Sequence, residues 1–141
     1  MFNRILVAID GSKMSEKALR AALDIAKERY SKICVIHVEK NLKISEGMPN
    51  ATIDLLYKEQ NNESEDLLKH AVSLAEREGI EIEVQSVMGE PAIQIVKKAE
   101  EGNYQMIVMG SRGLGNLKGL MLGSVSQKVS QLSHCPVLII K

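Results

Sequence analysis

The stretch Met109–Gln127, MGSRGLGNLKGLMLGSVSQ, contains five of the chain's ten glycines within fourteen residues and follows the apolar run YQMIV at 104–108. Glycine in an ordered segment costs backbone entropy, so such a cluster is typical of tight turns, helix ends or a backbone that another group approaches closely. A short apolar run, a glycine-rich loop and a helix start in this order resemble one unit of an α/β sheet. The loop is also a candidate ligand site.

Further apolar runs lie on both sides of this unit. They are rich in Ile and Val and bounded by Gly, Asp, Ser or Pro, which predicts strands at 4–9, 32–38, 80–88, 104–109 and 136–141. Three of them are almost continuously apolar, as are parallel strands buried on both faces, whereas 80–88 alternates as a half-exposed edge strand does.

Amphipathic segments separate the predicted strands. Apolar residues at three- and four-residue steps predict a first helix over 15–30, with Ser15 as its N-cap, and a second over 53–78. A third helix begins at Pro91 and ends near 102, and a fourth runs from about Ser124 to the residues before the Cys135–Pro136 pair. The segment 40–52 is predicted to be a surface loop.

The alternation of strands and helices predicts an α/β fold. We expect residues 1–141 to form a single domain, built on one doubly wound five-stranded parallel sheet with helices on both faces. Ligands bind such sheets at the carboxyl ends of the strands. Both the DGS turn after the first strand and the glycine cluster after the fourth lie at such ends, so neighbouring strands would bring them to one crevice.

Composition excludes several classes of protein. Lysine plus arginine and aspartate plus glutamate number 18 each, which leaves no net field to attract nucleic acid or an anionic membrane. No apolar run approaches the roughly 20 residues of a membrane span, so we expect a soluble cytoplasmic protein. Cys34 and Cys135 are far apart in sequence and lack metal-ligand spacing, which favours reduced thiols.

The glycine loop has the features of an anion site. The helix predicted at Ser124 turns its unpaired amides toward the loop, Ser124 and Ser126 offer hydroxyl donors, and Arg112 and Lys118 offer charge. A Walker A loop would need a lysine before its Ser or Thr, and LGSVS has none. A dinucleotide fingerprint should follow the first strand, and GLGNLK follows the fourth and lacks the third glycine.

The spacing Gly110-x2-Gly113-x9-Gly123-Ser124 resembles the signature of the universal stress protein family, specifically its ATP-binding branch. ILVAIDGS, VIHV, GEP, IVMGSRG and CPVLII match the family's segments in the same order, so the resemblance covers nearly the whole chain. It implies an adenine nucleotide alpha hydrolase-like fold with strand order 3-2-1-4-5. It also implies ATP as the ligand, with Mg2+ or Mn2+ carried by the phosphates. Adenine specificity rests on the family alone.

The resemblance assigns roles to individual residues. Asp10 matches the acidic residue near the ribose or the metal and phosphates, and Val38 matches the aliphatic residue against the adenine. The implied binding set is Ala8, Asp10, Val38, Met109, Gly110, Arg112, Gly113, Gly123, Ser124, Val125 and Ser126, with no catalytic residue and no metal ligand. Lys13 departs from the small residue or proline of many relatives.

Structural explanations compete at several of these positions. The glycine cluster could be a plain connecting loop, and Asp10 could serve only the turn in DGS. His37 reads as a core or strand-end histidine, and neither His70 nor His134 has a partner at metal or triad spacing. The charged run 58–66 is interpreted as a solvated helix face, with a partner-binding surface as the alternative.

Three functions remain open on the sequence. The first is a dimeric, nucleotide-dependent regulatory switch in stress response with an unknown protein partner. The second is a slow ATPase or autophosphorylating protein using the same pocket, and the third is a dimeric interaction protein that binds no nucleotide. The apolar strand Val137, Leu138, Ile139 and Ile140 is the expected homodimer edge. Two other classes of α/β protein are disfavoured. A flavodoxin would need aromatic residues in its loops to hold the flavin, and a response-regulator receiver would need a second acidic residue next to Asp10 for its metal site.

Overall fold

The computed structural model describes residues 2–113 and 122–141. Strands and helices alternate along the chain in the predicted order: β1 (Arg4–Ile9), α1 (Lys13–Arg29), β2 (Lys32–Glu39), α2 (Asn50–Arg77), β3 (Ile82–Met88), α3 (Pro91–Glu101), β4 (Met106–Gly110), α4 (Ser124–Leu132) and β5 (Val137–Ile140). The five strands form one parallel sheet in the order β3-β2-β1-β4-β5. The predicted fold class and strand order are therefore confirmed.

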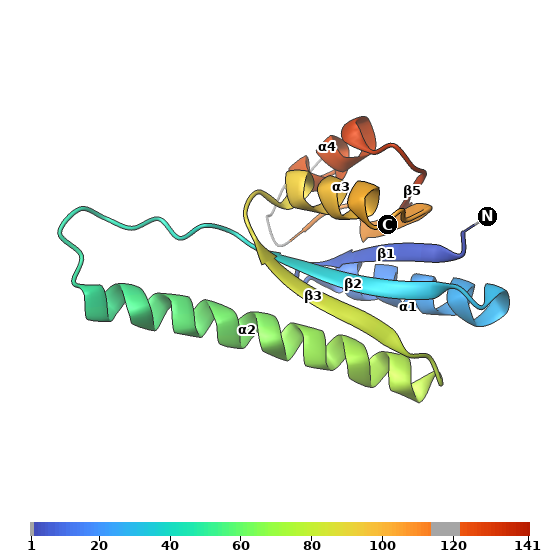
Figure 1. The fold of residues 1–141 in the computed structure, drawn as a ribbon, viewed down its shortest axis with the longest axis horizontal. Helices are drawn as coiled ribbons and strands as arrows, with labels where there is room; N and C mark the ends of the chain where they lie inside the picture. The colour runs from blue at the N-terminus through green and yellow to red at the C-terminus, as the bar shows by residue number, and fades with distance from the viewer. Residues whose placement is uncertain (1, 114–121) are drawn as a thin grey trace.

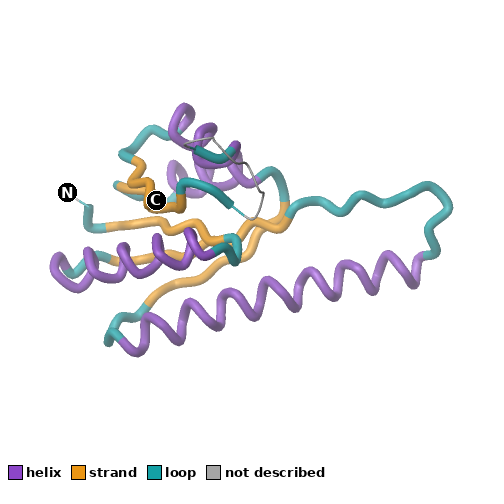
Figure 2. Tube along the Cα trace, turned by 180° about the vertical axis from the view of Figure 1, so that it is seen from behind, coloured by secondary structure: helices purple, strands orange, loops and turns teal. Residues whose placement is uncertain are grey.

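Helices cover both faces of the sheet (Figures 1 and 2). Successive strand residues point to opposite faces. In β1, Ile5, Val7 and Ile9 pack with α1 and α2, whereas Leu6 and Ala8 pack with α3 and α4. The two buried clusters explain why the central strands are almost continuously apolar.

The helix and strand starts differ from the predicted ones for local reasons. Ser12, not Ser15, is the N-cap of α1, because the Ser12 hydroxyl accepts the Ser15 N–H at 3.1 Å. Strands β3 and β4 start later than predicted, because the residues before them still form hydrogen bonds with the last turns of the preceding helices. The Ile80 N–H donates to Ala75 O and the Tyr104 N–H donates to Ala99 O, each at 2.9 Å.

Helix α2 is the element that the sequence described least well. It begins at Asn50, after Pro49, so the predicted loop is shorter and the helix longer than expected. Figure 1 shows the N-terminal end of α2 and the loop before it extending beyond the strands. Ile44 and Leu55 are exposed there. Among the described residues, no helix combines the length and hydropathy that crossing a membrane requires.

Candidate functional site

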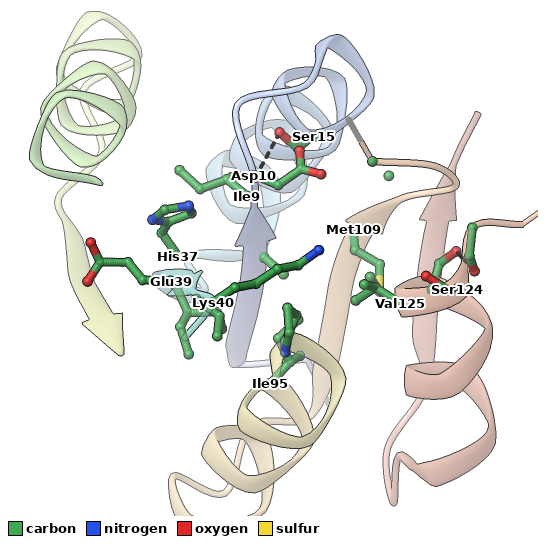
Figure 3. Close-up of a pocket in the computed structure, with 18 of the residues that line it drawn as sticks. Ile9, Asp10, Ser15, His37, Glu39, Lys40, Ile95, Met109, Ser124 and Val125 are labelled. Carbon is green, nitrogen blue, oxygen red and sulfur yellow. Dashed lines mark hydrogen bonds between the residues drawn. The ribbon is translucent and has the colours of Figure 1, made fainter. Parts of the chain in front are cut away.

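A cavity of about 480 Å3 opens at the carboxyl ends of β1, β2 and β4, beside the N-terminus of α4 (Figure 3). This volume falls in the range of small-molecule sites. Every residue of the binding set predicted from the sequence lines it: Ala8, Asp10, Val38, Met109, Gly110, Arg112, Gly113, Gly123, Ser124, Val125 and Ser126. The structure thus brings the set together, while the role of each residue in binding stays a prediction. Lys118 lies outside the described residues.

The cavity has an apolar side and a polar side. Strand alternation turns Ile36, Val38 and Met109 toward α3 and α4, where Ile95 and Val125 complete an apolar wall. Polar side chains from the ends of β1 and β2 and from α1 and α2 line another part of the cavity: Asp10, Ser15, His37, Glu39, Gln60 and Glu63. A ligand with a flat apolar part and polar substituents would fit this division.

The N-terminus of α4 forms the anion-binding end of the cavity. Gly123 is the N-cap and supplies no side-chain cap. The intrahelical hydrogen bonds begin where the Gln127 N–H donates to Gly123 O at 3.0 Å, so the amides of residues 124–126 precede the ladder. Three amides and the positive end of the helix dipole therefore face a cavity that Ser124 and Val125 line.

Ser126 corrects one expectation about this helix. The sequence predicts that its hydroxyl donates to the ligand, but Ser126 is only 2% exposed. Its hydroxyl is directed at two backbone carbonyls, Ser111 O at 2.7 Å and Gly123 O at 3.1 Å. Because a hydroxyl has one hydrogen, this contact leaves none for a ligand. Ser126 fastens α4 to the start of the glycine loop, whereas the exposed Ser124 side chain keeps its donor available.

The glycines of the motif allow segments of the protein itself to approach one another. A Cβ on Gly110 would lie 2.7 Å from Met14 Cβ at the start of α1, and one on Gly113 would lie 2.5 Å from Asp10 Oδ2. A Cβ on Gly123 would lie 3.3 Å from Arg112 Cα. The close approach inferred from the sequence is therefore at least in part protein against protein, and it joins the two loops that line the cavity.

Asp10 fulfils the turn role and also faces the site. Its Oδ1 accepts the Ser12 N–H at 2.9 Å, which makes the local turn before α1. Its Oδ2 is turned toward Gly113, across the gap between the β1 and β4 loops. The two explanations weighed on the sequence are thus compatible. Lys13 does not line this cavity, so the departure from the family pattern lies outside it.

His37 belongs to a hydrogen-bonded network that ties α2 to β2 and β3. His37 Nδ1 lies 2.7 Å from Ser64 Oγ, which lies 2.8 Å from Ser86 Oγ, and the Ser86 hydroxyl donates to Glu39 Oε2 at 3.3 Å. Each hydroxyl has one hydrogen, and that of Ser86 is donated to Glu39, so Ser64 donates to Ser86. Ser64 can then only accept from His37, which places the imidazole proton on Nδ1. Burial lowers the pKa of His37, which favours the neutral ring.

The network makes His37 a satisfied strand-end histidine, as expected. Sequence reasoning missed other lining residues, among them Glu39, Lys40, Gln60 and Glu63. Gln60 and Glu63 lie on α2, in the charged run that the sequence predicts to be a solvated helix face. Only the packing of α2 beside β2 shows that these two residues line the cavity. The alternation in VIHVEK already put Glu39 on the His37 face. Within the described ranges, no cluster of three His, Cys, Asp or Glu side chains could hold a metal ion.

Comparison with known proteins agrees with this geometry. The universal stress protein family matches residues 1–141. The universal stress protein YxiE of Bacillus subtilis is 43% identical over 148 aligned residues, which cover all of both chains. The solved structure of a universal stress protein in complex with cAMP has a TM-score of 0.76 and 29% identity, covering 99% of this chain and 97% of that one.

The structure of a universal stress protein from Archaeoglobus fulgidus in complex with dAMP has a TM-score of 0.72 and 29% identity, and the comparison covers all of both chains. Both relatives contain adenine nucleotides. Together with the full-length family match, the sheet order and the motif around the cavity, these likenesses establish that the chain belongs to the universal stress protein family.

Proposed function

We propose that this protein belongs to the ATP-binding branch of its family and binds ATP, or a related adenine nucleotide, in the cavity above β1 and β4. The observation that carries the proposal is the N-terminus of α4, where the amides of residues 124–126 precede the intrahelical hydrogen bonds and stand at one end of a cavity with an apolar wall. Amides at a helix N-terminus suit phosphate oxygens, and the apolar wall suits a purine ring.

Adenine is the base that we expect against Val38 and Ile95. Two relatives that are 29% identical to this chain were solved with cAMP and dAMP, which share the adenine ring and differ in sugar and phosphate. The eleven residues implied by the family resemblance, including Asp10 beside the expected ribose, are then the proposed nucleotide-binding set, to which Ser126 contributes its backbone amide rather than its hydroxyl.

Mg2+, or Mn2+, would be carried mainly by the phosphates. The described residues lack a ready-made set of three ligands, and Mg2+ commonly keeps several waters while it bridges substrate phosphates and one or two carboxylates. Asp10 is the carboxylate placed next to the glycine loop. When bound, the ion would neutralise part of the phosphate charge, and Asp10 would orient it.

The strand β5 is the surface that we propose for a homodimer. It ends the sheet order, and all four of its residues are only half-buried although they are apolar. An apolar edge strand invites pairing with a second copy. Sedimentation at micromolar concentration should give the dimer mass, and a monomer throughout would contradict this part of the proposal.

The function we propose is that of a regulatory switch in stress response. The nucleotide would bind the α4 amides and both loops, and the bound state would differ from the empty state in its affinity for a protein partner. Slow ATP hydrolysis in the same cavity is the alternative. Its test is phosphate release in multiple turnovers that is abolished by Asp10→Asn.

Calorimetric titration of nucleotide-stripped protein tests the main proposal. ATP with Mg2+ should bind saturably at about one site per chain, and GTP should bind more weakly. Absence of ATP binding by folded protein would refute the proposal and direct attention to the dimer and its partners.

A further inference from the structure

Lys40 is a lining residue that lies outside the glycine motif. It is the first residue after β2, and its side chain extends over the cavity toward Met109 on β4 (Figure 3). Met109 precedes the glycine loop, so the ammonium is directed toward the side of the cavity where α4 begins.

The backbone of Lys40 is held in place by the neighbouring helix. Gln60 Nε2 on α2 donates to Lys40 O at 2.6 Å. The Glu39 side chain before it is buried and accepts the Ser86 hydroxyl. The lysine side chain therefore starts from a fixed point at the rim, although the loop beyond it extends away from the sheet (Figure 1).

The charges around the cavity leave the Lys40 ammonium available. Three carboxylates line the cavity: Asp10, which accepts the Ser12 N–H, Glu39, which accepts the Ser86 hydroxyl, and Glu63. No ion pair between Lys40 and a carboxylate occurs among the residues described. The three carboxylates would repel a polyanion, whereas the Lys40 ammonium would attract it.

We propose that Lys40 binds the phosphates of the nucleotide and sets a preference for phosphorylated ligands over the nucleoside. The inference rests on the proposed function, since it assigns a residue to the same cavity. An ammonium has three donors and no acceptor, so it complements phosphate oxygens better than the mixed donors and acceptors of a base edge. Lys40 would approach the phosphates from the β2 side, opposite the α4 amides.

The variant Lys40→Gln tests this role, because it removes the charge and retains a polar side chain of similar reach. Lys43→Gln is the matched control, since Lys43 is exposed on the same loop and does not line the cavity. Calorimetric titrations with ATP and Mg2+, AMP and adenosine, at low and high salt, separate charge from shape. Lys40→Arg keeps the charge and should retain wild-type affinity within about threefold.

We expect Lys40→Gln to weaken ATP binding about tenfold and AMP binding less, while adenosine binding stays within twofold of wild type. High salt should reduce the difference for ATP. Lys43→Gln should match wild type for all three ligands.

Two results would overturn the assignment while leaving the proposed function intact. One is wild-type ATP affinity in Lys40→Gln, and the other is an equal loss for ATP and adenosine, which would give Lys40 a structural or base-contacting role. If the wild-type protein binds neither ATP nor AMP, the proposed function fails and this inference fails with it.

Discussion

The contact between Gly113 and Asp10 gives the sharpest test of how the site is built. A Cβ at Gly113 would lie 2.5 Å from Asp10 Oδ2. C···O contacts are usually no shorter than about 3.3 Å, so the carboxylate or the loop must withdraw by roughly 0.8 Å. The backbone of Gly113 is not in the left-handed region, so space alone opposes a side chain.

The withdrawal has a cost because the same carboxylate makes the turn before α1. Moving it lengthens or breaks the 2.9 Å bond from the Ser12 N–H, and a hydrogen bond to a charged group contributes about 1.5–3 kcal/mol. For a half-exposed aspartate we expect the lower end of that range. Gly113→Ala should therefore lower the free energy of unfolding by about 1.5 kcal/mol and weaken ATP binding about tenfold, or 1.4 kcal/mol. Gly113→Val should weaken binding at least as much.

Urea denaturation and calorimetric titration of ATP with Mg2+ measure the two effects. Their cause is isolated by a double-mutant cycle with Asp10→Ala, which removes the carboxylate that the new methyl group would meet. In that background Gly113→Ala should have little further effect on stability or binding. Gly113→Ala protein with wild-type affinity and an unchanged denaturation midpoint would refute the assigned contact. Equal losses with and without the carboxylate would place the cause elsewhere in the loop.

Three further predictions follow from the same geometry. Ser126→Ala should lower the free energy of unfolding in urea by about 1–3 kcal/mol, because it removes a buried hydrogen bond. Ser124→Ala should leave the stability unchanged and weaken ATP binding. The reverse pattern would contradict the roles assigned to the two serines. Gly110→Ala should lower the free energy of unfolding by about 1–3 kcal/mol, since its Cβ would lie 2.7 Å from Met14 Cβ. An unchanged denaturation midpoint would show that α1 can move away from the new methyl group without loss of stability. Burial holds the pKa of His37 below 6.5 in the folded protein, so as the pH falls the unfolded chain binds the proton first. The free energy of unfolding should therefore decrease as the pH drops below about 6.5. His37→Gln should reduce this pH dependence in urea denaturation measured between about pH 7.5 and 5.

Much of the fold and part of the site followed from the sequence. Apolar periodicity reports whether a segment is buried on one face or two, so it identified the five strands and four helices. The motif spacing identified residues that the fold collects at one cavity. The predicted starts of β3 and β4 were wrong by two residues, because Ile80 and Tyr104 still form hydrogen bonds with the ends of the preceding helices. Apolar character alone does not distinguish these two conformations.

What the sequence by itself determined is the order of elements, the parallel sheet and the glycine spacing, because each depends on residues close together along the chain. The tertiary structure alone decided which partners those residues meet. It directed the Ser126 hydroxyl to the backbone, set Gly113 against Asp10, and brought Gln60 on α2 to the Lys40 carbonyl. These contacts depend on the packing of segments that are distant in sequence, and no local pattern encodes the distance between two such side chains.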